Sequence, residues 1–436
     1  MSINSSKKNS HLSWHTANRQ YLIDAVNHVR QLLEHQVAQI TSQEPSIPLE
    51  DSSPTELETL FNDLDTPLVL ETLSHRFGLS QFERQILLLC AGAELSQSVG
   101  PLCAALHGNP QQAYPTLGLA LALFPEPEWG ALTPDAPLRR WRMIEILPGS
   151  ELTRSPLRID EQVLHTLMGI PGSDARLQGL VKFASAEFSP ILPESHQALV
   201  EQIVATGLGS EPVIQLCGGD SATKVAISTT TAAQLGLSLH TITADALPTD
   251  QSQINLLQCI WERESIFANS LLLLDCDHLA ITGEDAQRLA PIIRLIENST
   301  RPIMVSSWER MPQRHRPFLT IDVSSPTPAE QRQLWYSHLG ESGQQLNGHV
   351  SQLVTYFNLS AQSIQTVCNQ VNRDPSNLKS QIWQACLAQA RPKLGELAQR
   401  MQSGATWENL VLPDPEFQVL KTIAAHVRQR ATVYEQ

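Results

Sequence analysis

The residues best suited to chemistry lie between Gly218 and Val225, in the run Gly-Gly-Asp-Ser-Ala-Thr-Lys-Val. A phosphate-binding loop has the pattern G-x-x-x-x-G-K-[ST]. Its glycines let backbone N–H groups surround the phosphates, its Lys contacts the terminal phosphates, and its hydroxyl binds magnesium. Gly218 and Lys224 are in register with this pattern, and Gly219 extends the glycine turn. The run therefore predicts a nucleotide-binding loop.

Three positions of this loop depart from the pattern. Thr223 replaces the second glycine, so it restricts the backbone and adds bulk where a phosphate would lie. Val225 replaces the hydroxyl residue and has no oxygen to offer a cation. Asp220 adds a negative charge that would face a polyphosphate. We therefore expect ATP, ADP and Mg²⁺ to bind weakly or not at all.

A second motif, LLLLDCDHL, follows further along the chain and contains two acidic residues. Its apolar strand ends in Asp275, the position that holds Mg²⁺ in nucleotide sites, which makes Asp275 the candidate metal ligand. The next position, where a Glu normally activates water, is Cys276, and a thiol is a poor base at neutral pH. Asp277 lies one residue beyond that position, so strand alternation predicts that its side chain points to the face opposite to that of a catalytic Glu. The motif thus predicts that the catalytic base is lost.

Strands and helices alternate around these motifs from about Ser195 onward. The expected strands are VIQLCGG, SLHTITADAL, SLLLLDCDHL and RPIMVSSWE, and the helices between them are TKVAISTTTAAQLG, INLLQCIWERESIFA and AQRLAPIIRLIENS. Nearly all-apolar central strands are typical of a doubly wound parallel sheet covered on both faces. Beyond Pro326 the expected elements are four helices, TPAEQRQLWYSHLG, HVSQLVTYFN, SAQSIQTVCNQVN and LKSQIWQACLAQAR, which predict a small all-α domain.

The N-terminal half has a different pattern. Apolar residues at three-to-four-residue intervals predict a helix from Trp14 to about Ile40, followed by a polar linker rich in Ser, Pro and Glu. Two further helices are separated by a break at Gly78, and Ser80 with Glu83 forms the capping box of the second. Short β-like runs follow, in PLRRWRMIEIL and SPLRID, as in the wing of a winged-helix fold.

The expected organisation has five parts. These are an N-terminal helix and linker (1–60), a winged-helix-like domain (61–180), an α/β core with an altered phosphate loop (190–325), a helical lid (326–404) and a closing linker (405–436).

Positive charge gathers in the winged-helix region at Arg139, Arg140, Arg142, Arg154 and Arg158. These side chains either contact DNA phosphates or form surface and interdomain ion pairs and protein contacts. The whole chain has 30 Lys plus Arg against 44 Asp plus Glu, a net charge of 30 − 44 = −14, which favours the second interpretation. Nucleic acid is therefore not the expected partner.

The cysteines and the apolar runs bear on location. Seven scattered cysteines without a Cys-x-x-Cys spacing are typical of thiols in a reducing cytoplasm. The N-terminus MSINSSKKNSHLSW lacks the apolar core of a signal peptide, and no run is long enough to span a membrane. A cytoplasmic location is expected.

The order of loop, acid-ended strand, polar strand end and helical domain resembles an AAA+ ATPase module. In that resemblance Ser306 or Ser307 falls at the sensor-one position, and Gln365 stands where a sensor-two Arg would reach the γ-phosphate. Three arginines lie where an arginine finger is often found, with an ordinary surface charge as the alternative for each: Arg310, Arg314 and Arg316.

Several phrases narrow the resemblance. RFGLSQFERQILLLCAGAEL, PTLGLALALF, LTPDAPLRRWRMIE, PLRIDEQVLH and QACLAQARPKLGELAQRM are similar to the large ATPases of phage-tail-like contractile injection systems. The resemblance implies a winged-helix region, a degenerate first AAA+ module and an intact second one. Residues 407–435 resemble the segment that leads into that second module, which the printed sequence does not contain. It also implies a homo-oligomeric ring, expected to be a hexamer, with injection-system proteins as partners.

Three hypotheses follow. In the first, the chain is the regulatory and assembly part of an ATPase that remodels injection-system components, with a weak or inactive nucleotide site. In the second, Lys224 and Asp275 support slow but genuine ATP hydrolysis. In the third, the winged-helix region and its arginines make the chain a DNA-binding regulator.

Overall fold

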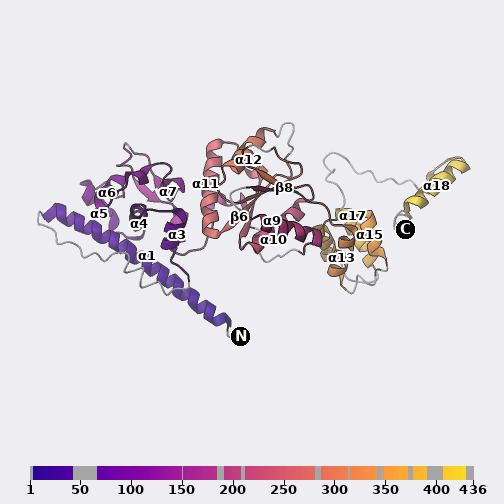
Figure 1. The fold of residues 1–436 in the computed structure, drawn as a ribbon, viewed down its shortest axis with the longest axis horizontal. Coiled ribbons are helices and arrows are strands. Elements are labelled where there is room, and N and C mark those ends of the chain that lie inside the picture. Colours follow the sequence, from indigo (N-terminus) through magenta and orange to yellow (C-terminus); the bar gives the residue numbers. More distant parts are fainter. Residues whose placement is uncertain are drawn as a thin grey trace. The chain divides into compact units, whose positions relative to one another are not determined.

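The chain forms two compact units, whose helices and strands are shown in Figure 1. Unit 1 comprises Met1–Val181 and Pro248–Asn269, and unit 2 comprises Lys182–Leu247 and Ser270–Gln436. The computed structural model describes residues 3–42, 66–149, 151–183, 191–207, 212–279, 286–312, 315–340, 346, 348–371, 377–389 and 406–428. In those residues no single helix has the length and composition to cross a membrane, and one sharply bent pair, Gln81–Leu95 with Val99–His107, passes that test jointly.

Unit 1 is mostly helical. Its helices are α1 (Ile3–Ser42), α3 (Val69–Phe77), α4 (Gln81–Leu95), α5 (Val99–His107), α6 (Leu117–Leu123), α7 (Pro137–Arg140), α8 (Glu161–Leu167) and α11 (Gln251–Ala268), with 3-10 turns at Trp129–Leu132 and Ala175–Leu177. Strands β1 (Ile144–Ile146) and β2 (Leu157–Ile159) form an antiparallel pair.

The predicted helix–turn–helix is present in unit 1. Gly78 ends α3 with φ +66°, the left-handed conformation that glycine adopts without a steric penalty. At the start of α4 the Glu83 N–H donates to Ser80 Oγ at 3.2 Å, and the Ser80 N–H donates to the Glu83 carboxylate at 3.0 Å. The predicted capping box is therefore formed, and with the β1–β2 hairpin it gives the expected winged-helix arrangement.

Helix α1 contributes its apolar stripe to the core of unit 1. Its side chains at Tyr21, Leu22, Val26, Val29 and Leu33 are all buried, and they join the same cluster as the apolar side chains of α3 to α8. Burial of each apolar side chain of this size stabilises the folded state by about 1.5–3 kcal/mol relative to leaving it exposed. Helix α1, expected to be separate from the winged-helix region, shares one core with it.

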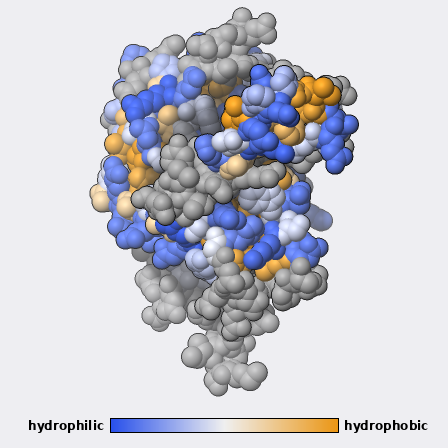
Figure 2. All heavy atoms as spheres, turned by 90° about the vertical axis from the view of Figure 1, so that its right-hand side faces the viewer, coloured by the Kyte–Doolittle hydropathy of each residue, from blue (hydrophilic) through white to orange (hydrophobic). Residues whose placement is uncertain are grey.

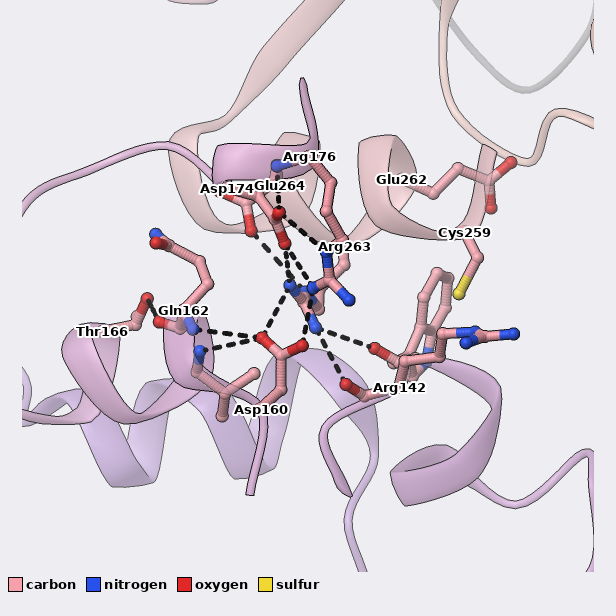
Figure 3. A network of polar contacts seen from close by, with 12 residues as sticks. Arg142, Asp160, Gln162, Thr166, Asp174, Arg176, Cys259, Glu262, Arg263 and Glu264 are labelled. Atoms are coloured by element: carbon pink, nitrogen blue, oxygen red, sulfur yellow. Dashed lines mark hydrogen bonds and ion pairs between the residues drawn. The ribbon is translucent and has the colours of Figure 1, made fainter. Parts of the chain in front are cut away.

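A buried ionic network holds α11 in unit 1 (Figure 3). Arg263 has no exposed side chain, and its guanidinium donates to Asp174 at 2.7 Å and to the Arg142 carbonyl at 2.9 Å. Asp160 lies 3.1 Å from the same guanidinium. Burial raises the pKa of the neighbouring Glu264 to about 7, against the opposing effect of Arg263. Helix α11 was expected within the α/β core, but its contacts group it with unit 1.

Unit 2 contains the sheet and the helical domain. Its strands are β3 (Val181–Phe183), β4 (Val213–Cys217), β5 (Ser238–Thr243), β6 (Ser270–Asp275), β7 (Ile303–Ser307) and β8 (Phe318–Asp322), and its helices in this part are α9 (Glu194–Thr206), α10 (Ser221–Gln234) and α12 (Ala286–Asn298). A short 3-10 turn follows β5 at Ala244–Ala246.

The sheet has the strand order β3-β5-β6-β7-β4-β8. The pairings β5–β6, β6–β7, β4–β7 and β4–β8 are parallel. The four predicted strands are confirmed as β4, β5, β6 and β7. The edge strands β3 and β8 were not predicted, because three to five residues with mixed exposure give a weak pattern.

The predicted helical domain is also present. Its helices are α13 (Pro328–Leu339), α15 (His349–Tyr356), α16 (Ala361–Gln370) and α17 (Leu378–Gln389), and they share one hydrophobic cluster. A 3-10 turn (Trp407–Asn409) and α18 (Asp414–Arg428) follow. Figure 2 views the molecule from the α18 end of Figure 1 and shows hydrophobic areas among the hydrophilic surface. The exposed apolar side chains of this last segment include Val411, Val419, Leu420, Ile423 and Val427.

Candidate nucleotide site

The altered phosphate loop connects β4 to α10. Gly218 and Gly219 both have left-handed backbones, with φ +76° and +56°. A Cβ atom on Gly219 would lie 2.9 Å from the Val323 carbonyl oxygen, closer than real Cβ atoms come to other atoms. Gly219 must therefore be a glycine, both because its φ angle is left-handed and because the chain after β8 approaches it closely.

Asp220 caps α10 with both of its carboxylate oxygens. The Thr223 N–H donates to Oδ1 at 2.7 Å, and the Thr223 hydroxyl donates to Oδ2 at 2.8 Å. The first N–H groups of a helix attract anions because they lack partners within the helix. In this structure the Asp220 carboxylate accepts from one of them, the N–H of Thr223.

Lys224 lies inside the protein. Its side chain is 0% exposed, forms an ion pair with Asp277, and donates to the Ser307 carbonyl at 3.1 Å. The Ser307 hydroxyl accepts from Gln215 Nε2 at 2.7 Å. The lysine expected to contact terminal phosphates is thus enclosed by protein groups, and the hydroxyl at the sensor-one position is engaged by a neighbouring strand.

The predicted direction of the Asp277 side chain was wrong. Strand β6 ends at Asp275 and Asp277 lies in the following turn, so strand alternation does not set its direction. The carboxylate of Asp277 meets Lys224, and its second oxygen is buried without a hydrogen-bond partner among the described residues. The side chain therefore neutralises the lysine and is not open to activate a water molecule.

Asp275, the candidate metal ligand, also has internal partners. Its Oδ1 accepts from the Ser306 hydroxyl and from the Asp277 N–H, both at 3.1 Å, and its Oδ2 accepts from the Ser221 hydroxyl at 3.3 Å. Cys276 beside it is 3% exposed, and burial together with the neighbouring Asp275 carboxylate raises the pKa of its thiol. A thiol in this state stays protonated and cannot serve as a base near neutral pH.

The arginine-finger candidates differ in position. Arg310 is exposed and forms an ion pair with Asp322 at 2.7 Å. Arg316 is buried and donates to the Ile296 and Ser299 carbonyls at 2.6 and 2.9 Å, so it binds the end of α12. Arg314 lies outside the described residues.

Two cavities border the loop, and they differ in size. The larger, of about 860 Å³, is lined by Gly219, Asp220, Trp308, Ser324 and Ser360 among others, and the described residues that line it include no Lys or Arg. The smaller, between α9, α10 and α16, holds only about 10 Å³ and is lined in part by Thr223 and Gln365. The open space beside the loop therefore lacks the positive charge that a polyphosphate needs.

The arginines of the winged-helix region contact groups of their own unit. Four of them make these contacts: Arg139 with the Leu132 carbonyl at 2.5 Å, Arg140 with the Trp141 ring at 5.0 Å, Arg154 with Glu151 at 3.3 Å and Arg158 with Glu94 at 3.8 Å. The fifth, Arg142, offers its backbone carbonyl to Arg263. This arrangement fits the ion-pair interpretation better than a row of phosphate contacts.

Comparison with known proteins adds two domain assignments. Residues 327–392 match the family model of the contractile injection system ATPase helical domain. Residues 63–181 match the family model of a winged helix domain, variant. No curated protein matches the chain. The first match covers α13 to α17 and confirms the expected resemblance to contractile injection system ATPases for the helical domain. The second match confirms the expected winged-helix region.

Solved structures of AAA domains are among the matches. The FIGL-1 AAA domain is 13% identical with a TM-score of 0.33, over 52% of this chain and 92% of that one. PCH-2 of C. elegans is 8% identical with a TM-score of 0.32, over 48% of this chain and 74% of that one. The expected order of a winged-helix region, an α/β core with a parallel sheet and a helical domain is present.

Proposed function

We propose that this chain is the docking and ring-building part of an AAA ATPase-like protein of a contractile injection system, and that its nucleotide site does not hydrolyse ATP. One observation carries the second half of the proposal. Lys224 has no exposed surface and is bound by Asp277 and by the Ser307 carbonyl. A lysine in a working site must be available to the terminal phosphates of the nucleotide.

The other loop residues do not fit Mg²⁺–ATP. Asp220 accepts the hydrogen bonds that a phosphate would take, and its charge repels one. Val225 offers no oxygen to a metal ion, and the buried thiol of Cys276 cannot activate water. Asp275 keeps a carboxylate, but position 225, where the loop pattern places a magnesium-binding hydroxyl, holds a valine.

The partners we propose are further copies of the chain in a ring and the proteins of an injection system, in the cytoplasm. The match of residues 327–392 to an injection-system ATPase domain supports the second partner. The exposed apolar side chains of α18 support contact with another polypeptide, because a helix usually buries such a face. The net charge of −14 and the internal contacts of the arginines argue against nucleic acid.

Titration calorimetry with ATP and Mg²⁺ on the full chain tests the nucleotide proposal. We expect no binding heat at a ligand concentration of about 1 mM, which corresponds to a binding free energy weaker than about −4 kcal/mol. Magnesium-dependent binding that disappears in Lys224→Ala would contradict the proposal and favour the slow-ATPase hypothesis. The matched control is Lys421→Ala, which removes an exposed lysine from α18.

A further inference from the structure

We propose that Asp220 is a built-in substitute for a phosphate, which closes the loop from within and holds it ordered without a nucleotide. The proposal rests on the proposed function, in which this site does no ATP chemistry, and it adds the device that keeps the site closed. The device consists of Asp220 with Thr223 at the start of α10 and of Asp277 with Lys224 behind it.

The Asp220 carboxylate accepts one backbone N–H and one hydroxyl at the start of α10. Its two oxygens lie 2.7 and 2.8 Å from Thr223 N and Thr223 Oγ1, at the positive end of a helix of 14 residues. Thr223 is the residue that replaces the second glycine of the loop pattern. The two departures from the pattern are therefore coupled, because the hydroxyl that came with the threonine binds the carboxylate that blocks the loop.

A second carboxylate, that of Asp277, forms an ion pair with the lysine of the same loop. Lys224 is fully buried, and the Asp277 side chain that pairs with it is only 7% exposed. The Oδ2 atom of Asp277 is buried without a hydrogen-bond partner among the residues described. A carboxylate at this depth is retained only if its charge is matched, and Lys224 supplies the match. Both contacts that a phosphate chain would use, the helix start and the lysine, are thus made by the protein itself.

The backbone around Gly219 limits how far the loop can open. The Val323 carbonyl packs so closely on Gly219 that no side chain fits there. To reach the Thr223 N–H, a phosphate would have to displace the Asp220 carboxylate, which already accepts from it.

An ordinary helix cap in the same chain provides the comparison. Asp250 caps α11 by accepting from the N–H groups of Ser252 and Gln253, both at 3.0 Å. It follows no Gly-Gly turn, and no buried lysine follows it. If Asp220 were only a cap, its replacement would change stability as replacement of Asp250 does, and it would not change the affinity of the loop for anions.

The experiment is a calorimetric titration of inorganic pyrophosphate into the full chain and its Asp220→Ser variant. Serine keeps a capping oxygen and removes the charge. We expect no heat from the natural chain and a gain in affinity of at least about tenfold in Asp220→Ser, because a like charge in contact with the ligand is removed. Asp250→Ser, which removes the charge of an ordinary helix cap, should match the natural chain.

Two outcomes would overturn the inference. One is a folded Asp220→Ser protein, by circular dichroism, that still shows no pyrophosphate binding. The other is a natural chain that binds pyrophosphate as tightly as the variant. If Asp220→Ser does not fold, Asp220→Asn replaces it, since asparagine also caps helices without charge. Failure of the proposed function looks different, because the natural chain would then bind Mg²⁺–ATP through Lys224.

Discussion

At the scale of single residues, the Lys224–Asp277 pair decides the state of the candidate site. A buried ion pair adds little net stability, but the loss of one partner leaves an uncompensated charge in the interior. The pair encloses the Lys224 side chain and binds the chain after β6 to α10. This contact links the function that we propose to the folding of unit 2.

We predict that Lys224→Met lowers the free energy of unfolding by about 3–5 kcal/mol, because Asp277 is then buried without a counter-charge. Adding Asp277→Leu should recover most of the loss, since two apolar side chains need no charge partner. Urea unfolding of the natural chain, the single variant and the double variant measures the effect. Lys421→Met is the control, and we expect a change within about 0.5 kcal/mol. Equal losses in the single and double variants would contradict the prediction.

At the scale of secondary-structure elements, Glu330 joins α13 of the helical domain to α9 of the α/β core. Its carboxylate accepts from the Ser195 N–H at 2.7 Å and from the Thr327 N–H at 2.8 Å. Burial alone would raise the pKa of Glu330, but these amide hydrogen bonds outweigh it and lower the pKa to about 2. The capping box of α13 thus also fastens the helical domain to the first helix of the core.

The pH dependence of Glu330 follows from that shift. Its pKa is lower in the folded chain than the ordinary value of 4.5, so its stabilisation is complete above about pH 4.5 and is lost as the pH falls toward 2. We predict that Glu330→Gln unfolds at lower temperature than the natural chain at about pH 7, and that the difference shrinks as the pH is lowered to about 3. Calorimetry across this range checks it, with the exposed α18 variant Glu416→Gln as control. A difference that is independent of pH would contradict the prediction.

At the scale of the whole molecule, the exposed apolar face of α18 should matter for assembly. Leu420 and Ile423 lie three residues apart on this helix and are exposed. We predict that Leu420→Glu with Ile423→Glu lowers the average mass of the particles that the chain forms in solution, because each charge makes burial of the apolar face between chains unfavourable. Sedimentation velocity measures the mass, and Gln418→Glu with Thr422→Glu is the matched control. If the natural chain is monomeric at about 100 μM, ring formation by this chain alone is ruled out.

The sequence by itself determined the order of the elements and the chemistry missing from the site. Apolar strands, capping signals and the phosphate-loop pattern are local. Neighbouring residues therefore identified β4 to β7, the capping box of α4 and the departures at Thr223, Val225 and Cys276. Gly78 and Ser80 likewise act through bonds that span only a few residues.

Only the tertiary structure decided which groups meet across long stretches of chain. Lys224 and Asp277 are far apart in the sequence, as are Arg263 and Asp174, and no local pattern pairs them. The end of β6 at Asp275 turned Asp277 toward the loop, and contacts across unit 1 gathered α1 and α11 into it. Burial and charge pairing depend on the whole packed chain, so the enclosure of Lys224 by Asp277 became visible only there.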